Sequence, residues 1–476
     1  MRKHLIYLMV AAMAIFTSCE KDETAKAPAV TAPANANVEI SSNIDLTFGF
    51  TAEAGFKSAS AVATNGNVTI NTDGTSGSES GNIVVTYTAG TSVGAGSVVL
   101  TVTDNDDQSS SATAVISVVE EELVISVPGN ITENTTWKTG KVYTLESRIA
   151  VVSGVTLTIE PGVIVKGQAG TGANATALLI ARGGKIMAEG TADSPIIFTS
   201  IADEIMPGEV ASPNLDPVLN GLWGGLLILG NAPISADAAS VQIEGIPPSD
   251  QNGLYGGDNA TDNSGVLRYV SIRHGGANIG EGNEINGLTL GGVGSGTIIE
   301  NVEIIANQDD GIEWFGGTVS VKNAIIWNVG DDAVDTDQSW AGTLDNFIVV
   351  NPGDECFELD GPEGSMSAGH FIKNGTVYAQ DAEGLVDLDD NSIAEMTGIY
   401  FFGIAEGQDF DLNPAGLVAS GLQATLPEGA VVTDYFKAGS DGFVTIVAEG
   451  ANTVGADVTK FETWSWASVS GALNDF

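Results

Sequence analysis

Four successive segments of this chain carry carboxylates at matching positions, and grouped carboxylates can hold hard cations or exchange protons in acid–base catalysis. Each segment opens on an asparagine that starts a β-branched run, namely Asn301, Asn323, Asn346 and Asn374. The asparagines are 22, 23 and 28 residues apart, and each precedes the final acid of its segment by 12 or 13 residues. A repeat of this length with strand-like alternation predicts a solenoid.

Alignment of the four segments predicts columns of acids on one face of the solenoid, because successive residues of a strand point to opposite faces. Repulsion within a column requires raised pKa values, solvent or bound cations, and oxygen-only ligands favour Ca²⁺ as the cofactor. An acidic face that is merely solvated is the alternative. The predicted metal ligands are Glu313, Asp335, Asp337, Glu358, Asp360, Asp387 and Asp389, and further acids precede them at Asp309/Asp310, Asp331/Asp332, Asp354/Glu355 and Glu383.

The elements that must position these acids are short stacked strands around an apolar interior. We expect an inward ladder with small residues just before it and a structural ladder of the four asparagines at a corner. Cys356 precedes an inward position and is expected to be a buried structural thiol. The expected ladder is Leu288, Ile312, Val334, Phe357 and Val386.

The composition limits the possible partners of the protein. The chain has 61 acidic and 17 basic residues and a formal charge of −44, which excludes nucleic acid because phosphate binding needs Lys and Arg. Acidic polysaccharide is disfavoured unless a metal bridges the charges. The 60 glycines and many Val, Ile and Thr residues predict an all-β fold.

The first residues predict export. Residues 1–18 have a basic start and a short apolar run, as in a signal peptide. The Thr17-Ser18-Cys19 phrase resembles a lipobox, which implies that Cys19 becomes lipidated; an unlipidated signal peptide that ends near a cysteine is the alternative. The next residues, Lys21, Asp22 and Glu23, resemble the surface-export signal of Bacteroidetes lipoproteins. This resemblance implies a lipid anchor in the outer membrane, facing the extracellular side.

Changes in composition divide the mature chain into four parts. Residues 19–36 are Ala-, Pro- and Thr-rich and predict a tether, and residues 37–121 alternate like a small β-sandwich whose last hairpin resembles immunoglobulin-like modules of the cadherin or PKD type. We expect a β-helix over 124–405, with loops at 202–220 and 246–264 walling a binding face. Residues 406–476 should form C-terminal coils and an aromatic cap, including Trp464 and Trp466, over the last coil.

Three phrases carry a resemblance to a known fold: LTIEPGVIVKG from residue 157, GTADSPIIFTS from residue 190 and GLWGGLLILG from residue 221. They resemble bacterial surface proteins with a right-handed parallel β-helix, the pectin-lyase-like fold. The resemblance implies the fold of residues 124–405 and says little about activity, because this fold serves lyases, hydrolases, adhesins and passive stalks.

A second resemblance bears on catalysis. Asp310 before a glycine, followed 21 residues later by the pair Asp331 and Asp332, resembles the catalytic acids of polygalacturonase-type glycosidases, which are inverting hydrolases. That family also has a His-Gly and an Arg-x-Lys on later coils. This chain has no arginine after Arg273, and His274-Gly275 lies on an earlier coil. Hydrolysis of a uronic acid polymer is therefore not expected, whereas hydrolysis of a neutral glycan stays open.

The sequence leaves three functions open. The leading prediction is non-catalytic binding of a glycan or a surface protein through the acidic face, with Trp340 stacking on a sugar ring beside Asp337 and Asp360. The second is a polysaccharide hydrolase or lyase that uses paired carboxylates on coils 309–390. The third is a passive structural or adhesive stalk.

Overall fold

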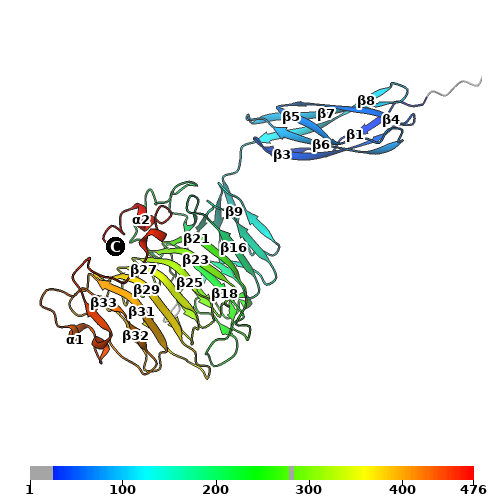
Figure 1. Cartoon of the computed structure of the whole chain (residues 1–476). Coiled ribbons are helices and arrows are strands. Elements are labelled where there is room, and N and C mark those ends of the chain that lie inside the picture. The colour runs from blue at the N-terminus through cyan, green and yellow to red at the C-terminus, as the bar shows by residue number, and fades with distance from the viewer. Residues whose placement is uncertain (1–24, 278–283) are drawn as a thin grey trace, which may run out of the picture. The chain divides into compact units, whose positions relative to one another are not determined.

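The computed structural model describes residues 25–277 and 284–476, which form two compact units (Figure 1). One unit extends to Glu122 and the other starts at Leu123. No helix within the described residues is long and apolar enough to cross a membrane. The predicted lipidation site Cys19 and export residues Lys21, Asp22 and Glu23 lie outside the described residues.

The N-terminal unit consists of two four-stranded sheets with one apolar core between them. Alternate residues of the long strands are buried, as in Leu46, Phe48 and Phe50 of one strand. The first sheet contains β1 (Ala29–Thr31), β3 (Asn43–Thr51), β6 (Ser80–Ala89) and β5 (Gly66–Thr72). The second contains β2 (Ala36–Glu39), β8 (Ser109–Val119), β7 (Gly94–Asp104) and β4 (Phe56–Thr64).

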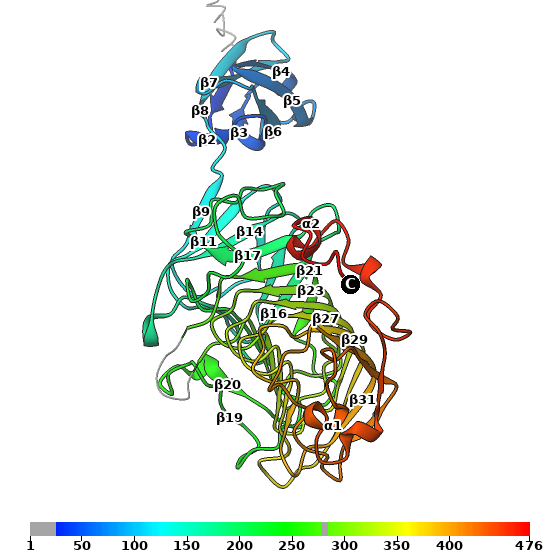
Figure 2. The same cartoon turned by 90° about the vertical axis from the view of Figure 1, so that its left-hand side faces the viewer.

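The C-terminal unit is the parallel β-helix that the sequence predicted. Its coils stack strand upon strand into a sixteen-stranded sheet and an eight-stranded sheet, in which the named strands pair in parallel (Figures 1 and 2). The eight-stranded sheet contains β12 (Ile149–Val151), β15 (Leu178–Ile180), β18 (Leu226–Leu229), β22 (Leu288–Gly291), β24 (Ile312–Phe315), β26 (Val334–Asp337), β28 (Glu358–Leu359) and β30 (Asp387–Leu388).

The sixteen-stranded sheet follows the chain in order along its main path. That path contains β9 (Val124–Val127), β11 (Val142–Leu145), β14 (Ile164–Gly167), β17 (Ile196–Ser200), β21 (Gly265–Arg273), β23 (Ile298–Ile305), β25 (Val321–Trp327), β27 (Thr343–Val350), β29 (His370–Tyr378), β31 (Ala394–Phe402), β33 (Leu422–Ala424) and β34 (Val444–Ile446). Beside it lie β10 (Thr135–Trp137), β13 (Thr156–Ile159), β16 (Lys185–Glu189) and β32 (Val418–Ser420).

A few short elements complete the unit. The antiparallel hairpin of β19 (Val241–Gln242) and β20 (Leu254–Tyr255) stands apart from both large sheets (Figure 2). The helices are α1 (Val432–Tyr435) and α2 (Trp466–Val469), with single 3₁₀ turns at Gly172–Asn174, Gln251–Gly253, Ser440–Gly442 and Val458–Lys460.

The predicted apolar ladder is confirmed. All five of its members are at most 1% exposed, and Leu288, Ile312 and Val334 are aligned across β22, β24 and β26. Cys356 is also buried, as expected.

The asparagine ladder is confirmed for three of its four members. Asn323 Nδ2 donates to Asn301 Oδ1 at 2.9 Å, and Asn346 Nδ2 donates to Asn323 Oδ1 at 2.8 Å. Asn374 breaks the series, because it is exposed and donates to Asp345 Oδ1 instead. All four residues have φ between 56° and 60°, a left-handed conformation that asparagine tolerates better than most residues.

The C-terminal aromatics do not cover the last coil, and this part of the prediction is wrong. Trp464 and Trp466 pack on the outside of the sixteen-stranded sheet, against Ile305, Ile325 and Ile348 from β23, β25 and β27. Tyr435 and Phe436, in and just after α1, join the main core instead. The outward side chains of Ile305, Ile325 and Ile348 give the aromatics an apolar surface there.

Candidate acidic site on the eight-stranded sheet

The predicted column of acids exists as a register of adjacent strands. Glu313 of β24 is aligned with Asp335 of β26, which is aligned with Glu358 of β28, which is aligned with Asp387 of β30. Thr289 of β22 precedes Glu313 in this column. Adjacent strands lie about 4.8 Å apart, so each carboxylate has another as its nearest charged neighbour along the stack.

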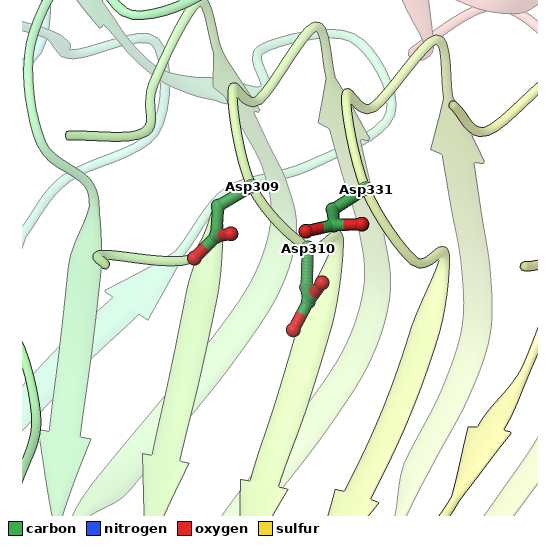
Figure 3. A group of neighbouring side chains, drawn as sticks. All are labelled: Asp309, Asp310 and Asp331. Carbon is green, nitrogen blue, oxygen red and sulfur yellow. The ribbon is translucent and has the colours of Figure 1, made fainter. Parts of the chain in front are cut away.

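Two overlapping groups of carboxylates converge at the start of these strands. Oxygens of Asp309, Asp310 and Asp331 lie within 4.8 Å of one another at the turns that lead into β24 and β26 (Figure 3). Oxygens of Asp310, Glu313 and Asp335 also lie within 4.8 Å of one another. Asp310 belongs to both groups, and we call these five residues the acidic cluster.

The backbone of each turn fixes the acids of the turn before it. The Asp332 amide donates to Asp310 Oδ1 at 3.1 Å, and the Glu355 amide donates to Asp332 Oδ1 at 2.7 Å. Asn307 Nδ2 donates to the Asp310 carbonyl at 2.8 Å. Gly311 is required at this turn, because an added Cβ would lie 2.4 Å from Ile326 Cγ2. The Asp-Gly phrase therefore has a structural cause as well as any functional one.

Burial and mutual repulsion raise the pKa values of these acids. Asp310, Glu313 and Asp335 are only 5–8% exposed. Their pKa values lie well above the usual range, mainly because the groups are buried and also because neighbouring carboxylates repel the charged form. The same causes raise the pKa of Asp309 to about 8 and that of Asp331 to about 6. Every neighbouring charge that contributes to these five shifts is another carboxylate.

The remaining predicted acids are arranged along the column and outside the cluster. Burial raises the pKa of Asp337 to about 8 and that of Asp360 to about 7. Burial, together with a hydrogen bond to Glu358, raises the pKa of Asp332 to about 11. Asp387 and Asp389 are exposed. The alternative prediction, an acidic face that is merely solvated, therefore fits the β30 end of the column.

Two residues that the repeat did not reveal contribute to the site. Glu244 follows β19, and burial raises its pKa to about 7. Asn286 is fully buried; its Nδ2 donates to Glu313 Oε2 and lies 3.4 Å from Glu244 Oε1. Its Oδ1 is buried and has no hydrogen-bond partner among the described residues. Glu244 lies in an inserted segment, where alignment of the repeat gives no signal. Asn286 occupies the position before Gly287 that Asp310 occupies before Gly311, but it is not an acid and so is absent from the predicted columns.

A second column of charges, on the sixteen-stranded sheet, provides an internal comparison. Register aligns six residues from β16 to β29 whose charges alternate in sign: Glu189, Arg268, Glu300, Lys322, Asp345 and Lys373. Arg268 bridges Glu189 and Glu300 at 3.1 Å each, and Lys373 lies 3.7 Å from Asp345. On the sixteen-stranded sheet, bases placed between the acids thus compensate the repulsion among them. On the eight-stranded sheet, the acids of the column have no bases between them.

Trp340 does not bind a sugar ring, and that prediction is wrong. The side chain is 1% exposed and lies in the helix interior, with its ring centroid 4.4 Å from that of Trp314 and 5.0 Å from that of His370. Its Nε1 donates to the Val319 carbonyl at 2.8 Å. Both ring faces are occupied because the chain turns inward after β26 instead of outward.

The basic residues considered for catalysis lie away from the acidic cluster. Arg273 is fully buried, 3.7 Å from Glu303, and its guanidinium lies over the Trp466 ring. His274 is also buried and shares a hydrogen bond with the Leu219 carbonyl. Neither residue is therefore available to hold an acidic sugar at the cluster.

Comparison with known protein families agrees with this architecture. The sequence profile described as "Pectate-lyase like beta helix domain" matches residues 129–384. No curated protein sequence matches the chain significantly. Among solved structures, the family 28 exopolygalacturonase of Yersinia enterocolitica aligns at 11% identity over 89% of this chain and 90% of that one, with a TM-score of 0.20.

A second solved structure is similar to the same extent. It is the catalytic unit of a thermostable GH87 alpha-1,3-glucanase from Streptomyces thermodiastaticus strain HF3-3, at 12% identity over 87% of this chain and 89% of that one, with a TM-score of 0.27. The profile match covers more than half of the chain, over the same coils that build the acidic cluster. The chain belongs to the pectate-lyase-like β-helix domain family.

Proposed function

We propose that this protein is a lipid-anchored outer-membrane protein that faces the extracellular side and binds glycan, without catalysis, through a Ca²⁺-loaded acidic face. The anchor and the location rest on the resemblances at Cys19 and at Lys21, Asp22 and Glu23. The ion rests on the acidic cluster, and a surface protein remains the alternative partner for the same face.

The observation that carries the proposal is the contrast between the two charge columns. The sixteen-stranded sheet places a base between its acids, whereas Glu313, Asp335 and Glu358 follow one another on the eight-stranded sheet. Stacked buried carboxylates without a counter-charge destabilise the fold unless they are protonated or bind a cation. Several carboxylate oxygens close together suit Ca²⁺. Asn286 Oδ1, which has no hydrogen-bond partner among the described residues, offers a neutral oxygen of the kind that accompanies carboxylates in calcium sites.

Thermal unfolding of the mature chain in Ca²⁺ and in chelator tests the ion. At Ca²⁺ about 100-fold above its Kd, binding should stabilise the fold by about 2.7 kcal/mol, which raises the Tm by several degrees. A triple variant with Glu313→Gln, Asp331→Asn and Asp335→Asn should lose most of this rise. In chelator the variant should be more stable than the natural protein, because the repulsion has been removed.

A matched control separates this effect from a general loss of charge. Glu406→Gln, Glu428→Gln and Glu449→Gln remove three acids that the structure places on the surface, away from the cluster. This control should keep the full response to Ca²⁺. Equal responses of the natural protein and the cluster variant would exclude the calcium site and leave the passive stalk as the better proposal.

Catalysis is the second candidate, because Asp331 combines partial exposure with a pKa of about 6, within the range useful for acid–base chemistry. Asp310 and Asp331 converge, as the resemblance to polygalacturonase-type glycosidases implied, but Asp332 pairs with Glu358 instead. Release of reducing ends from neutral glycans by the natural protein, abolished in Asp331→Asn, would favour the enzyme over the binding protein.

A further inference from the structure

A cavity of about 500 Å³ lies beside the acidic column and has not yet been assigned an occupant. It is formed between the β19–β20 hairpin and the coils that carry β24 and β26. A volume of this size is typical of sites for small ligands. Its wall includes two aromatic rings, two amides and three acids: Tyr255, Phe315, Gln242, Gln338, Asp237, Glu244 and Glu363.

The aromatic floor of the cavity is held in place by hydrogen bonds. The rings of Tyr255 and Phe315 meet edge to face, with centroids 6.0 Å apart. Tyr255 OH donates to Gln338 Oε1 at 3.0 Å, and Gln338 Nε2 donates to Glu363 Oε2 at 3.0 Å. The cavity therefore presents ring edges next to a chain of polar groups. Such a surface suits a ligand that has both C–H faces and hydroxyl groups, as a sugar does.

The loop that forms the rim is tied to three successive coils. The Ser235 amide donates to the Gln338 carbonyl at 2.9 Å, and the Gly317 amide donates to the Pro233 carbonyl at 2.9 Å. The Gly364 amide donates to Ser235 Oγ at 3.0 Å. Arg182 holds the hairpin from behind through Ser240 Oγ at 2.7 Å and the Gly256 carbonyl at 2.8 Å. The cavity is therefore preorganised, which lowers the entropic cost of binding.

The charges around the cavity have one sign. Among the residues that the structure describes, no Lys, Arg or His lines it, whereas Asp237, Glu244 and Glu363 do. Asp337 adds to this field, because Glu244 and Glu363 are among the charges that act on it. A site of this kind attracts a cation and repels an acidic sugar.

We propose that this cavity binds an amine-bearing sugar unit of the glycan, a hexosamine with a free amino group, whose ammonium contacts Glu244 and Glu363 and whose C–H groups lie against Val241 and the edge of Phe315. The inference rests on the proposed glycan-binding function and adds the class of sugar. The ammonium supplies the positive charge that the cavity wall lacks. Sugars with a carboxylate are excluded by the same wall.

Calorimetric titration of the mature chain in Ca²⁺ with four probes tests this inference. The probes are a glucosamine trisaccharide, its N-acetylated counterpart, a galacturonic acid trisaccharide and a lysine tripeptide. The glucosamine trisaccharide should bind best, and its affinity should fall as salt is added. N-acetylation removes the charge and both charge-assisted contacts, to Glu244 and Glu363, and should weaken binding by more than about tenfold.

Glu363→Gln is the informative variant, because Glu363 is exposed and lies outside the acidic cluster. It should weaken binding of the glucosamine trisaccharide about tenfold while leaving the Ca²⁺ response of the Tm unchanged. Glu406→Gln removes an equal charge from the surface elsewhere and should leave both properties unchanged.

The failures of the two proposals differ. Absence of glucosamine binding with a normal Ca²⁺ response would overturn the sugar assignment and leave the ion in place. Tighter binding of the galacturonic acid trisaccharide would overturn the sugar class while supporting a glycan-binding function that a metal bridges. Equal binding of the lysine tripeptide would show that the cavity recognises charge alone, which also overturns the assignment.

Discussion

The carboxyl groups of this protein differ in chemistry because they differ in burial. Asp310 and Asp389 are both aspartates next to strands of the eight-stranded sheet, the first just before β24 and the second just after β30. Asp310 is buried, whereas Asp389 is exposed. Burial penalises the ionised form, and each further carboxylate within a coil's distance adds to the penalty. The carboxyl groups that could best bind a cation are therefore those whose ionisation destabilises the fold most when no cation is present.

This strain predicts how stability depends on pH in the absence of metal. The pKa values of Asp309 and Asp337 are about 8 in the folded protein, whereas aspartates of an unfolded chain titrate near 4. The folded state thus binds more protons between these two limits, and stability is lost as the pH rises from about 4 to about 8. In chelator, the Tm should be higher at about pH 5.5 than at about pH 8.5.

Calcium should change this dependence. The ion binds ionised carboxylates, so saturating Ca²⁺ should reduce the difference between the two pH values or reverse it. A double variant with Asp309→Asn and Asp337→Asn should show a smaller difference in chelator. A natural protein that unfolds at the same or a higher temperature at about pH 8.5 in chelator would contradict the raised pKa values.

Stacking of the coils brings side chains at equivalent positions of adjacent strands next to one another. The charges in each such column therefore act on one another. The column through Arg268, Glu300 and Lys322 alternates in sign and forms ion pairs, whereas the column through Glu313, Asp335 and Glu358 does not. Both columns stand on the outward positions of their strands. The difference between them is one of sequence, and it is the reason that we propose a structural role for the first column and a binding role for the second.

Reversal of one charge in the alternating column tests this distinction. Lys322→Glu would place three acids in succession on adjacent strands, at positions 300, 322 and 345. Like charges directly opposite one another destabilise a sheet. We expect a loss of about 0.5–1 kcal/mol in the free energy of unfolding, measured with urea in low salt.

The control for this change is Lys322→Gln, which removes the charge without reversing it and should cost less. Added salt should reduce the loss in Lys322→Glu, because these side chains are near the surface. If the charge reversal is neutral, or if salt has no effect on it, the alternation of sign has no energetic role.

The whole molecule combines a β-helix, an N-terminal pair of sheets and a C-terminal segment that returns along the outside of the helix. That segment is fixed by Glu303, which accepts hydrogen bonds from the amides of Trp466 and Ala467 at 3.1 and 2.9 Å. A large excess of acids favours solubility, and divalent cations would relieve part of the repulsion among the 61 acids. These properties are consistent with the proposed site of action outside the cell.

Anchoring is tested on cells that express the full chain. Cys19→Ala should release the protein from the membrane fraction, because the lipid attached to this residue is the proposed anchor. Replacement of Lys21, Asp22 and Glu23 by alanine should leave the protein in the membrane fraction but protect it from protease added to intact cells. A Cys19→Ala variant that stays in the membrane, or an alanine variant still cleaved from outside, would contradict the corresponding step.

The sequence by itself determined the parts of this protein that follow from local periodicity. The period of the asparagines and the alternation along each strand specify the β-helix, the inward ladder and the register of Glu313, Asp335 and Glu358. Register follows from sequence here because a shift by one residue would turn the acids into the apolar interior of the helix and the ladder outward. The repeat also placed Asp310 and Asp331 correctly at the turns before β24 and β26.

Only the tertiary structure decided what lies against each coil from outside the repeat. It brought Glu244 beside Asn286 at the acidic cluster, occupied both faces of the Trp340 ring, and placed Trp466 on the outer sheet instead of the last coil. These placements depend on contacts between residues far apart in the chain, as between Trp466 and Glu303. Periodicity contains no information on such contacts, because inserted loops and the terminal segment have no equivalent in neighbouring coils.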